Sequence, residues 1–255
     1  MENTRAPQAE NKMGVMPVPK LLLTMSLPMI ISMLVQALYN VVDSMFVAQL
    51  NENALTAVSL AFPVQNLMIS ILTGTGVGIN ALLSRSLGEK KIDRANKVAN
   101  HGIILTIISF VVFLLIGIFF SKLFYTIQTQ DAQIVSYGTS YMKICCIFSF
   151  GMSLQITFER LLQSTGKTFY TMITQGLGAI INIILDPIMI FGLLGFPKLG
   201  VAGAAIATVT GQIIAAILAV WFNLKKNKEL HITLRGFKCP VKLLKGFTPW
   251  VFLLL

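Results

Sequence analysis

The sequence predicts an all-α polytopic membrane protein whose core is a six-helix transmembrane bundle. Hydrophobic residues make up 55% of the 255 residues and charged residues only 12%, whereas a soluble domain carries about 25% charged residues. The mean hydropathy is +0.76. The apolar residues also gather in long runs that can cross about 30 Å of hydrocarbon at roughly 1.5 Å per helical residue. The lipid bilayer is therefore the first partner that the sequence predicts.

Six apolar runs define the predicted spans. They lie at 21–48, 55–84, 98–120, 134–155, 169–194 and 201–224, and a seventh run starts near 241 and stops at once. The chain is thus divided into a cytoplasmic N-terminal segment (1–20), a six-span lobe (21–224), a cytoplasmic basic linker (225–245) and the start of a seventh span (246–255). No cleavable signal peptide is expected, because the first 20 residues hold three prolines and no apolar core.

Basic residues predict the orientation of these spans. The net charge is +10, but the basic residues lie between the apolar runs, where they meet anionic lipid headgroups, so we predict no nucleic-acid partner. With a cytoplasmic N-terminus, 17 of the 20 Lys and Arg residues fall on the cytoplasmic side, against Lys122, Lys143 and Lys198 outside. This bias predicts that both termini are cytoplasmic.

The first span carries an acid on a polar face. Gln36, Asn40 and Asp43 lie at i, i+4 and i+7 on one side of the helix, with Tyr39 beside them. Pro28 interrupts the hydrogen-bond ladder near the start of the same span, as a hinge or a kink. A charged side chain within a membrane is rare and marks a candidate functional site.

The second and third spans are assigned packing roles. The glycines of T-G-T-G-V-G lack the spacing and the preceding strand of a phosphate-binding loop, so we expect them to allow close helix packing. The following segment S-R-S-L-G-E-K-K-I-D-R-A-N-K is interpreted as a short cytoplasmic helix on the headgroups, or a charged linker. The third span has almost no polar face and is expected to face lipid, and His101 at its edge is expected to be satisfied by water or lipid.

The fifth span carries the second acid, in the run I-I-N-I-I-L-D-P-I-M-I-F-G. Asn182 and Asp186 are four residues apart on one face, and Gly178 and Gln175 extend this stripe. An aspartate at mid-membrane costs roughly 2.5–3.5 kcal/mol, so we interpret it as functional. The following Pro187 leaves a carbonyl without its helical donor. The alternative is a structural hydrogen bond between helices with a packing kink.

Two further polar groups lie beside this span. Glu159 and Arg160 precede it and are interpreted as an interfacial pair that ends the fourth span, with a gate as the alternative. In the sixth span, rich in small residues, Thr208 and Gln212 share a face from which they could reach Asp186.

The two acids together predict an ion site. Asp43 and Asp186 fall at comparable depths of outward-running helices, in the outer half of the bilayer, so both are expected to face one cavity. Burial and mutual repulsion favour the binding of a proton or a small cation there. A cationic substrate that competes with this ion gives exchange, because linkage is reciprocal.

Other chemistry is not predicted. No serine–histidine–carboxylate set, cysteine–histidine pair or metal-ligand cluster stands out, so we expect neither an enzyme nor a cofactor. The coupling ion is a proton or sodium, and sodium at Asp43 and Asp186 is the only metal considered. Cys145 and Cys146 are interpreted as small buried side chains.

Several motifs, in order, resemble the multidrug and toxic compound extrusion (MATE) family, close to its bacterial multidrug exporters. They are S-L-P-M-I with L-Y-N-V-V-D-S-M-F-V, the T-G-x-G to S-R-x-L-G-E-K segment, Q-S-T-G-K-T, N-I-I-L-D-P-I-x-I-F-G and G-V-x-G-A-A-I-A-T-V. The resemblance runs from about residue 20 to 244. It implies a transporter of twelve spans in two six-helix lobes, driven by protons or sodium, that expels small lipophilic cations across a bacterial plasma membrane.

The resemblance also implies roles for residues. This chain would be the amino-terminal lobe, without its C-terminal partner lobe. By resemblance, the cation site of that lobe corresponds to Asp43, Asn182, Asp186 and Thr208. The polar residues that we expect to line the substrate cavity are Gln36, Tyr39, Asn40, Gln175 and Gln212.

The end of the chain departs from the family pattern. The tail K-G-F-T-P-W-V-F-L-L-L does not resemble a seventh span, but one extra base before Gly246 permits a family-like continuation, so we hypothesise a frameshift. Two rival functions remain open. A lipid-linked saccharide flippase of similar architecture should line its cavity with basic side chains, and Lys143 is the only basic residue well inside a span. The chain could also be a nonfunctional truncated remnant.

Overall fold

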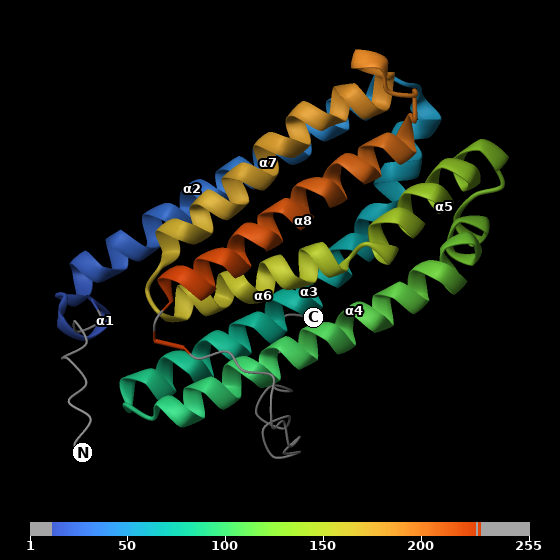
Figure 1. The fold of residues 1–255 in the computed structure, drawn as a ribbon. Helices are drawn as coiled ribbons and strands as arrows, with labels where there is room; N and C mark the ends of the chain where they lie inside the picture. Colours follow the sequence, from blue (N-terminus) through green and yellow to red (C-terminus); the bar gives the residue numbers. More distant parts are fainter. Residues whose placement is uncertain (1–11, 228, 231–255) are drawn as a thin grey trace.

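The computed structural model describes residues 12–227, 229 and 230. These residues form a bundle of long helices without strands (Figure 1). The proposed frameshifted tail and most of the basic linker lie outside the described residues. In order, the elements are α1 (Lys12–Val15), α2 (Val18–Ala48), α3 (Glu52–Gly88), α4 (Ile92–Gln128), α5 (Ala132–Ile147), α6 (Phe150–Ser164), α7 (Thr168–Phe191), the 3-10 turn η1 (Leu193–Gly195) and α8 (Val201–Lys226).

The predicted all-α membrane fold class is confirmed by five to six apolar spans among the described residues. Five single helices, α2, α3, α4, α7 and α8, are long and apolar enough to cross a membrane. The fourth predicted span is divided in two: α5 and α6 meet at an angle of 45°, and they give a sixth span when the bent pair is counted as one. This break lies at Phe148 and Ser149, between the two helices.

Local sequence determines several helix ends. The Asn51 side chain caps α3 by accepting a hydrogen bond from the Ala54 amide at 2.7 Å. Asp131 caps α5 by accepting from the amides of Gln133 and Ile134. At the end of α7, Gly192 adopts a left-handed φ of 76°, which glycine tolerates because it has no Cβ.

The segment between α3 and α4 corrects one expectation. A separate headgroup helix was predicted here, but α3 continues to Gly88 and α4 begins at Ile92. The charged residues therefore form the ends of two spans and a short turn. Within it, Glu89 contacts Lys91 at 2.8 Å and Arg85 at 2.9 Å. Hydrogen bonds from Lys91 and then Arg85 lower the pKa of Glu89 from about 4.5 to about 2.

The expectation that the third span faces lipid holds for only one side of α4. Ile107, Val111 and Phe119 are exposed. The opposite side is buried, and there the Tyr125 hydroxyl donates to the Ala57 carbonyl of α3 at 2.7 Å. The sequence missed this face because its small and aromatic residues pack without an obvious polar stripe.

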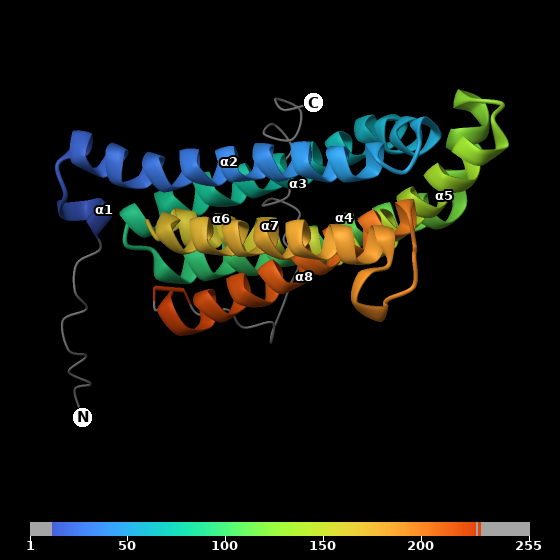
Figure 2. The same ribbon diagram turned by 90° about the horizontal axis from the view of Figure 1, so that it is seen from above.

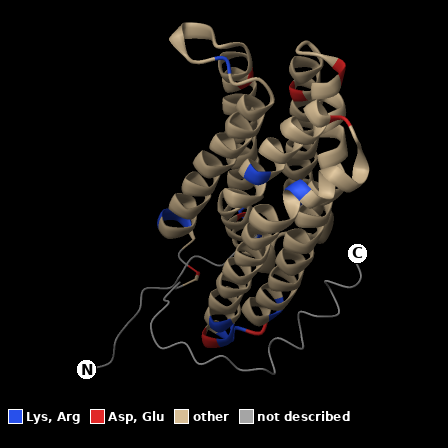
Figure 3. Cartoon of the chain, turned by 90° about the vertical axis from the view of Figure 1, so that its right-hand side faces the viewer, with Lys and Arg blue, Asp and Glu red and all other residues tan. Residues whose placement is uncertain are grey.

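The site depends on the position of α7, which lies between α2 and α8 (Figures 1 and 2). Helix α2 packs mainly on α7 and leaves much of its surface exposed, including Leu23, Leu34 and Leu38. Many of the Lys and Arg residues of the described part gather at the end of the bundle where α3 turns into α4 (Figure 3).

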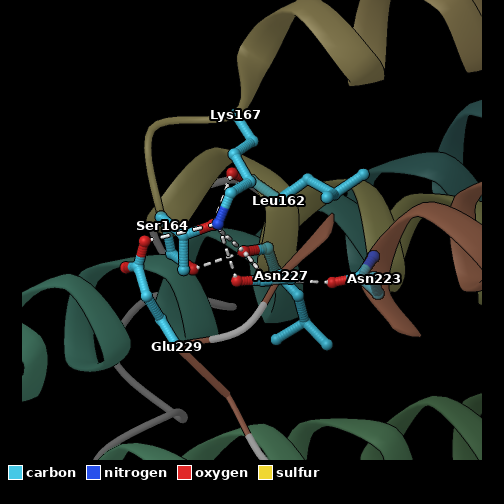
Figure 4. A network of polar contacts seen from close by, with 8 residues as sticks. Leu162, Ser164, Lys167, Asn223, Asn227 and Glu229 are labelled. Atoms are coloured by element: carbon cyan, nitrogen blue, oxygen red, sulfur yellow. Dashed lines mark hydrogen bonds and ion pairs between the residues drawn. The ribbon is translucent and has the colours of Figure 1, made fainter. Parts of the chain in front are cut away.

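A polar network fastens that same end of the bundle (Figure 4). Lys167, between α6 and α7, contacts Asn227 at 3.2 Å and Glu229 at 3.3 Å. Asn223 of α8 donates to the Phe158 carbonyl of α6 at 2.8 Å. These contacts connect α6, α7 and α8 at this end of the bundle.

Candidate functional site

The two predicted acids meet between α2 and α7. Asp186 is fully buried, and Asp43 is 9% exposed. Their carboxyl groups lie within hydrogen-bonding reach of each other, with the Tyr39 ring nearby. Asp43 Oδ1 is buried, and no described residue donates a hydrogen bond to it. The structure therefore brings together two acids that are 143 positions apart in the chain, and leaves one oxygen unsatisfied.

Asn182 extends this acid pair to α8. Its amide nitrogen donates to Asp186 Oδ2 at 3.1 Å when its oxygen accepts from the Thr208 hydroxyl at 3.1 Å. This orientation satisfies both sides of the carboxamide. The four residues that the family resemblance assigned to the cation site thus form one connected cluster across α2, α7 and α8. We call Asp43, Asn182, Asp186 and Thr208 the acid-pair centre.

The close approach of α7 and α8 makes this contact possible. A Cβ on Gly211 would lie 2.7 Å from the Gly178 carbonyl oxygen, and one on Gly178 would lie 3.2 Å from the Gly211 carbonyl oxygen. The two backbones are therefore in direct contact one helical turn from Asn182. Glycine is required there because any side chain would separate the helices and move Thr208 away from Asn182.

A small cavity of about 140 Å³ begins next to the acid-pair centre. Four of the five predicted cavity residues line it, and Asn182 and Thr208 also reach it. Neither Asp43 nor Asp186 is among its lining residues. The predicted residues that line it are Gln36, Tyr39, Gln175 and Gln212.

Asn40 does not join them. Its exposed side chain lies in a shallow depression on the outer face of α2, with Ser44, Met45 and Leu55. The helical spacing placed Asn40 close to Asp43, but the cavity is lined by the side of α2 that carries Gln36 and Tyr39. We therefore correct its placement in the cavity.

The far end of the cavity holds a carboxylate that the sequence reading assigned to a helix end. Glu159 lies within α6, is 2% exposed, and lines the cavity. Its Oε1 accepts from Gln155 at 3.1 Å and from the Thr174 hydroxyl at 2.9 Å, and its Oε2 accepts from Gln175 at 2.7 Å. The interpretation of Glu159 as an interfacial residue is therefore wrong. We call Glu159, Gln155, Thr174 and Gln175 the Glu159 centre.

Arg160 also lies inside the bundle. Its aliphatic carbons rest on Gly76 of α3, and its Nη1 donates to Gln163 at 2.8 Å. Among the described residues it forms no ion pair with Glu159 within 4 Å. Arg160 lines the cavity, so Lys143 is not the only basic residue well inside a span. A helical signal was available in the sequence: Glu159 and Gln155 are one turn apart.

The arrangement has the chemistry of ion binding. Two close carboxyl groups favour a proton or a small cation between them, because their repulsion is otherwise uncompensated. The described residues contain no group of three or more His, Cys, Asp or Glu residues with the geometry of a metal site. A transition-metal centre therefore has no ligand set in this part of the chain.

Comparison with known proteins agrees with this architecture. The sequence profile of the MatE family matches residues 28–188. The FAD transporter of Shewanella oneidensis is 31% identical over 215 residues, which are 84% of this chain and 48% of that protein. The probable multidrug resistance protein YoeA of Bacillus subtilis is 30% identical over 233 residues, which are 90% of this chain and 50% of that protein.

A solved structure is similar as well. It is described as the outward-facing conformation of a multidrug resistance MATE family transporter of the MOP superfamily, and matches with a TM-score of 0.84 at 29% identity. The match covers 92% of this chain and 52% of that one. The chain spans about half the length of the relatives that it matches. With the family profile matched over most of the six-span bundle, this multi-pass membrane protein belongs to the MatE family of transporters.

Proposed function

We propose that this chain is the amino-terminal lobe of an ion-coupled antiporter that exports lipophilic cations. We place it in the plasma membrane of a bacterium, with both termini in the cytoplasm. The observation that carries the proposal is the contact between Asp43 and Asp186, two acids on different spans that meet in the interior of a transporter lobe.

The acid-pair centre would act as the coupling site. A proton or sodium ion bound there removes the repulsion between the acids and holds α2 against α7, while Asn182 transmits the change to Thr208 on α8. Helix α2 has few other contacts, so its position is the one that ion loading can bias most. One charge crossing 100 mV supplies about 2.3 kcal/mol, or roughly fiftyfold accumulation of an exported substrate.

The cavity indicates that this lobe does not hold the whole substrate. Its volume is about 140 Å³, whereas pockets for drug-sized ligands enclose about 300–1,000 Å³. We propose that a second lobe completes the binding site, in agreement with relatives of twice the length. Gln36, Tyr39, Gln175 and Gln212 would supply the polar wall on this side.

A second candidate substrate is an anionic dinucleotide. Two observations favour it: Arg160 lines the cavity, and one relative that is 31% identical is named an FAD transporter. A basic cavity residue would also suit the phosphate of a lipid-linked saccharide. The cationic substrate remains our first proposal, because the lobe centres on carboxyl groups.

Transport into vesicles that carry this chain together with a second lobe, supplied from a relative of twice its length, tests the proposal. Ethidium and FAD are offered separately, under a sodium gradient alone and a pH gradient alone. We expect gradient-driven movement of ethidium that Asp186→Asn abolishes at near-normal protein levels. Movement of FAD but not ethidium would show that the substrate is an anionic dinucleotide and not a lipophilic cation. No movement under either gradient would favour the nonfunctional remnant, and unchanged transport by Asp186→Asn would overturn the site.

A further inference from the structure

A second buried acid, Glu159, shares the cavity with the acid-pair centre but has a different environment. It is 2% exposed, and three neutral donors from α6 and α7 surround its carboxyl group. Gln175 and Asp186 are 11 residues apart on α7, which corresponds to about 17 Å along the helix. The two centres thus lie at different depths of the bundle, and Glu159 and Asn182, one residue of each centre, line the same cavity.

The hydrogen bonds of Thr174 support two protonation states of Glu159. The Thr174 hydroxyl has one proton but lies near two acceptors: Glu159 Oε1 at 2.9 Å and the Thr171 carbonyl at 2.8 Å. When Glu159 is ionised, the hydroxyl donates to the carboxylate. When Glu159 is protonated, it can donate to the hydroxyl oxygen, and the hydroxyl then donates to Thr171. Every polar atom keeps a partner in both states.

Among the described residues, Glu159 forms no ion pair within 4 Å. The groups facing it from α7 are neutral amides and hydroxyls, and α8 and α3 contribute Gln212 and Thr73 to the cavity. Arg160 is the charged neighbour on α6, but its guanidinium bonds to Gln163. Besides Glu159 and Arg160, the titratable residue that lines the cavity is Tyr39 of α2.

We propose that Glu159 is a second proton-binding residue of this lobe, which takes up and releases a proton through the shared cavity independently of Asp43 and Asp186. Its role in transport rests on the proposed function, but its proton binding does not. In an exporter, it would hold a proton near the end of the bundle that carries the α3–α4 turn while the acid-pair centre is loaded or empty.

Infrared difference spectra of the purified chain, recorded across a pH titration, test this. The background variant is Asp43→Asn/Asp186→Asn, which removes the acid pair, and Glu159→Gln is added to it. We expect a titrating carboxyl band in the background variant that disappears on addition of Glu159→Gln. Spectra that are identical with and without Glu159 at every pH would overturn the proposal.

Substitutions of Thr174 separate a proton site from a merely structural acid. Thr174→Val removes a hydrogen bond that is stronger to the ionised than to the neutral carboxyl group, so we expect about tenfold tighter proton binding by Glu159. Thr174→Ser keeps the hydroxyl and should keep the wild-type midpoint. A midpoint that is the same in Thr174→Val and Thr174→Ser would contradict the two-state hydrogen bonding.

Transport measurements keep this inference separate from the proposed function. A titrating Glu159 band in a chain that moves no substrate even when a second lobe is present would support the proton site and count against the transporter. Gradient-driven transport without any Glu159 band would support the transporter and overturn the second site.

Discussion

The two acidic centres of the bundle surround their buried carboxyl groups with different hydrogen-bond partners. In the acid-pair centre, Asp43 and Asp186 face each other and Asp43 Oδ1 has no donor among the described residues. In the Glu159 centre, one carboxyl group receives three neutral hydrogen bonds. The first centre keeps a buried oxygen without a donor among the described residues, whereas both carboxyl oxygens of the second accept hydrogen bonds. We therefore predict that a bound ion affects the first centre more.

The largest effect is expected at the α7–α8 contact beside the acid-pair centre. Gly211→Leu would force a side chain against the Gly178 carbonyl, since even a Cβ lies 2.7 Å from it. We expect a loss of about 3 kcal/mol in unfolding free energy, measured by thermal unfolding in detergent. Gly176→Ala is the matched control because its Cβ meets nothing within 4 Å, and it should gain about 0.5–1 kcal/mol. Equal stability of the two variants would contradict the tight α7–α8 contact.

The second largest effect is expected in the stabilisation of the chain by bound ions, which should differ between the two centres. Sodium or protons should stabilise the wild-type chain by about 2.7 kcal/mol at about a hundred times the dissociation constant. Asp43→Asn should raise the stability without ions, because it removes the repulsion, and should abolish the response to sodium. Melting temperatures across sodium concentration and pH measure both effects. Ser44→Ala, on the exposed face of α2, is the control. A sodium response that survives Asp43→Asn would rule out the acid pair as the sodium site.

Removal of the Glu159 carboxyl group should lower the stability of the chain, whereas Asp43→Asn should raise it. Glu159→Ala leaves the Gln155, Thr174 and Gln175 donors without their acceptor, and we expect a loss of about 1–2 kcal/mol. Glu159→Gln keeps an acceptor oxygen and should lose less. Chemical unfolding of both variants in detergent measures the difference. If Glu159→Ala instead stabilised the chain, the view of Glu159 as satisfied by its neighbours would fail.

The smallest effect is expected for an acid outside the bundle. Glu89 lies on the exposed α3–α4 turn with its pKa lowered to about 2 by Lys91 and Arg85. Because this pKa is depressed in the folded state, its ion pairs contribute fully above the ordinary value of about 4.5 and are lost as the pH falls through about 2. Glu89→Gln should lower the melting temperature only slightly near neutral pH, and not at all in high salt. A large, salt-independent loss would show that Glu89 has a buried role.

Much of the bundle could be predicted from sequence because the bilayer imposes simple rules. The number of spans follows from the length of the apolar runs. Helical periodicity, together with the comparable depths of Asp43 and Asp186 in two outward-running helices, correctly predicted that these acids would lie close together. The same periodicity failed for Asn40, because a helical face is broad and only the packing of α7 decides which edge of α2 borders the cavity. The role of the acid-pair centre stays a prediction until ion binding is measured.

The sequence by itself determined the six spans, their apolar surfaces and the two acids on facing helices. Tertiary structure decided the bend between α5 and α6, the turn that replaced a headgroup helix, and the burial of Glu159 among Gln155, Thr174 and Gln175. The physical reason is that hydropathy measures transfer from water to lipid. It is insensitive to a carboxyl group whose transfer cost is offset by hydrogen bonds from residues on another helix, since those donors are brought to it only when the helices pack.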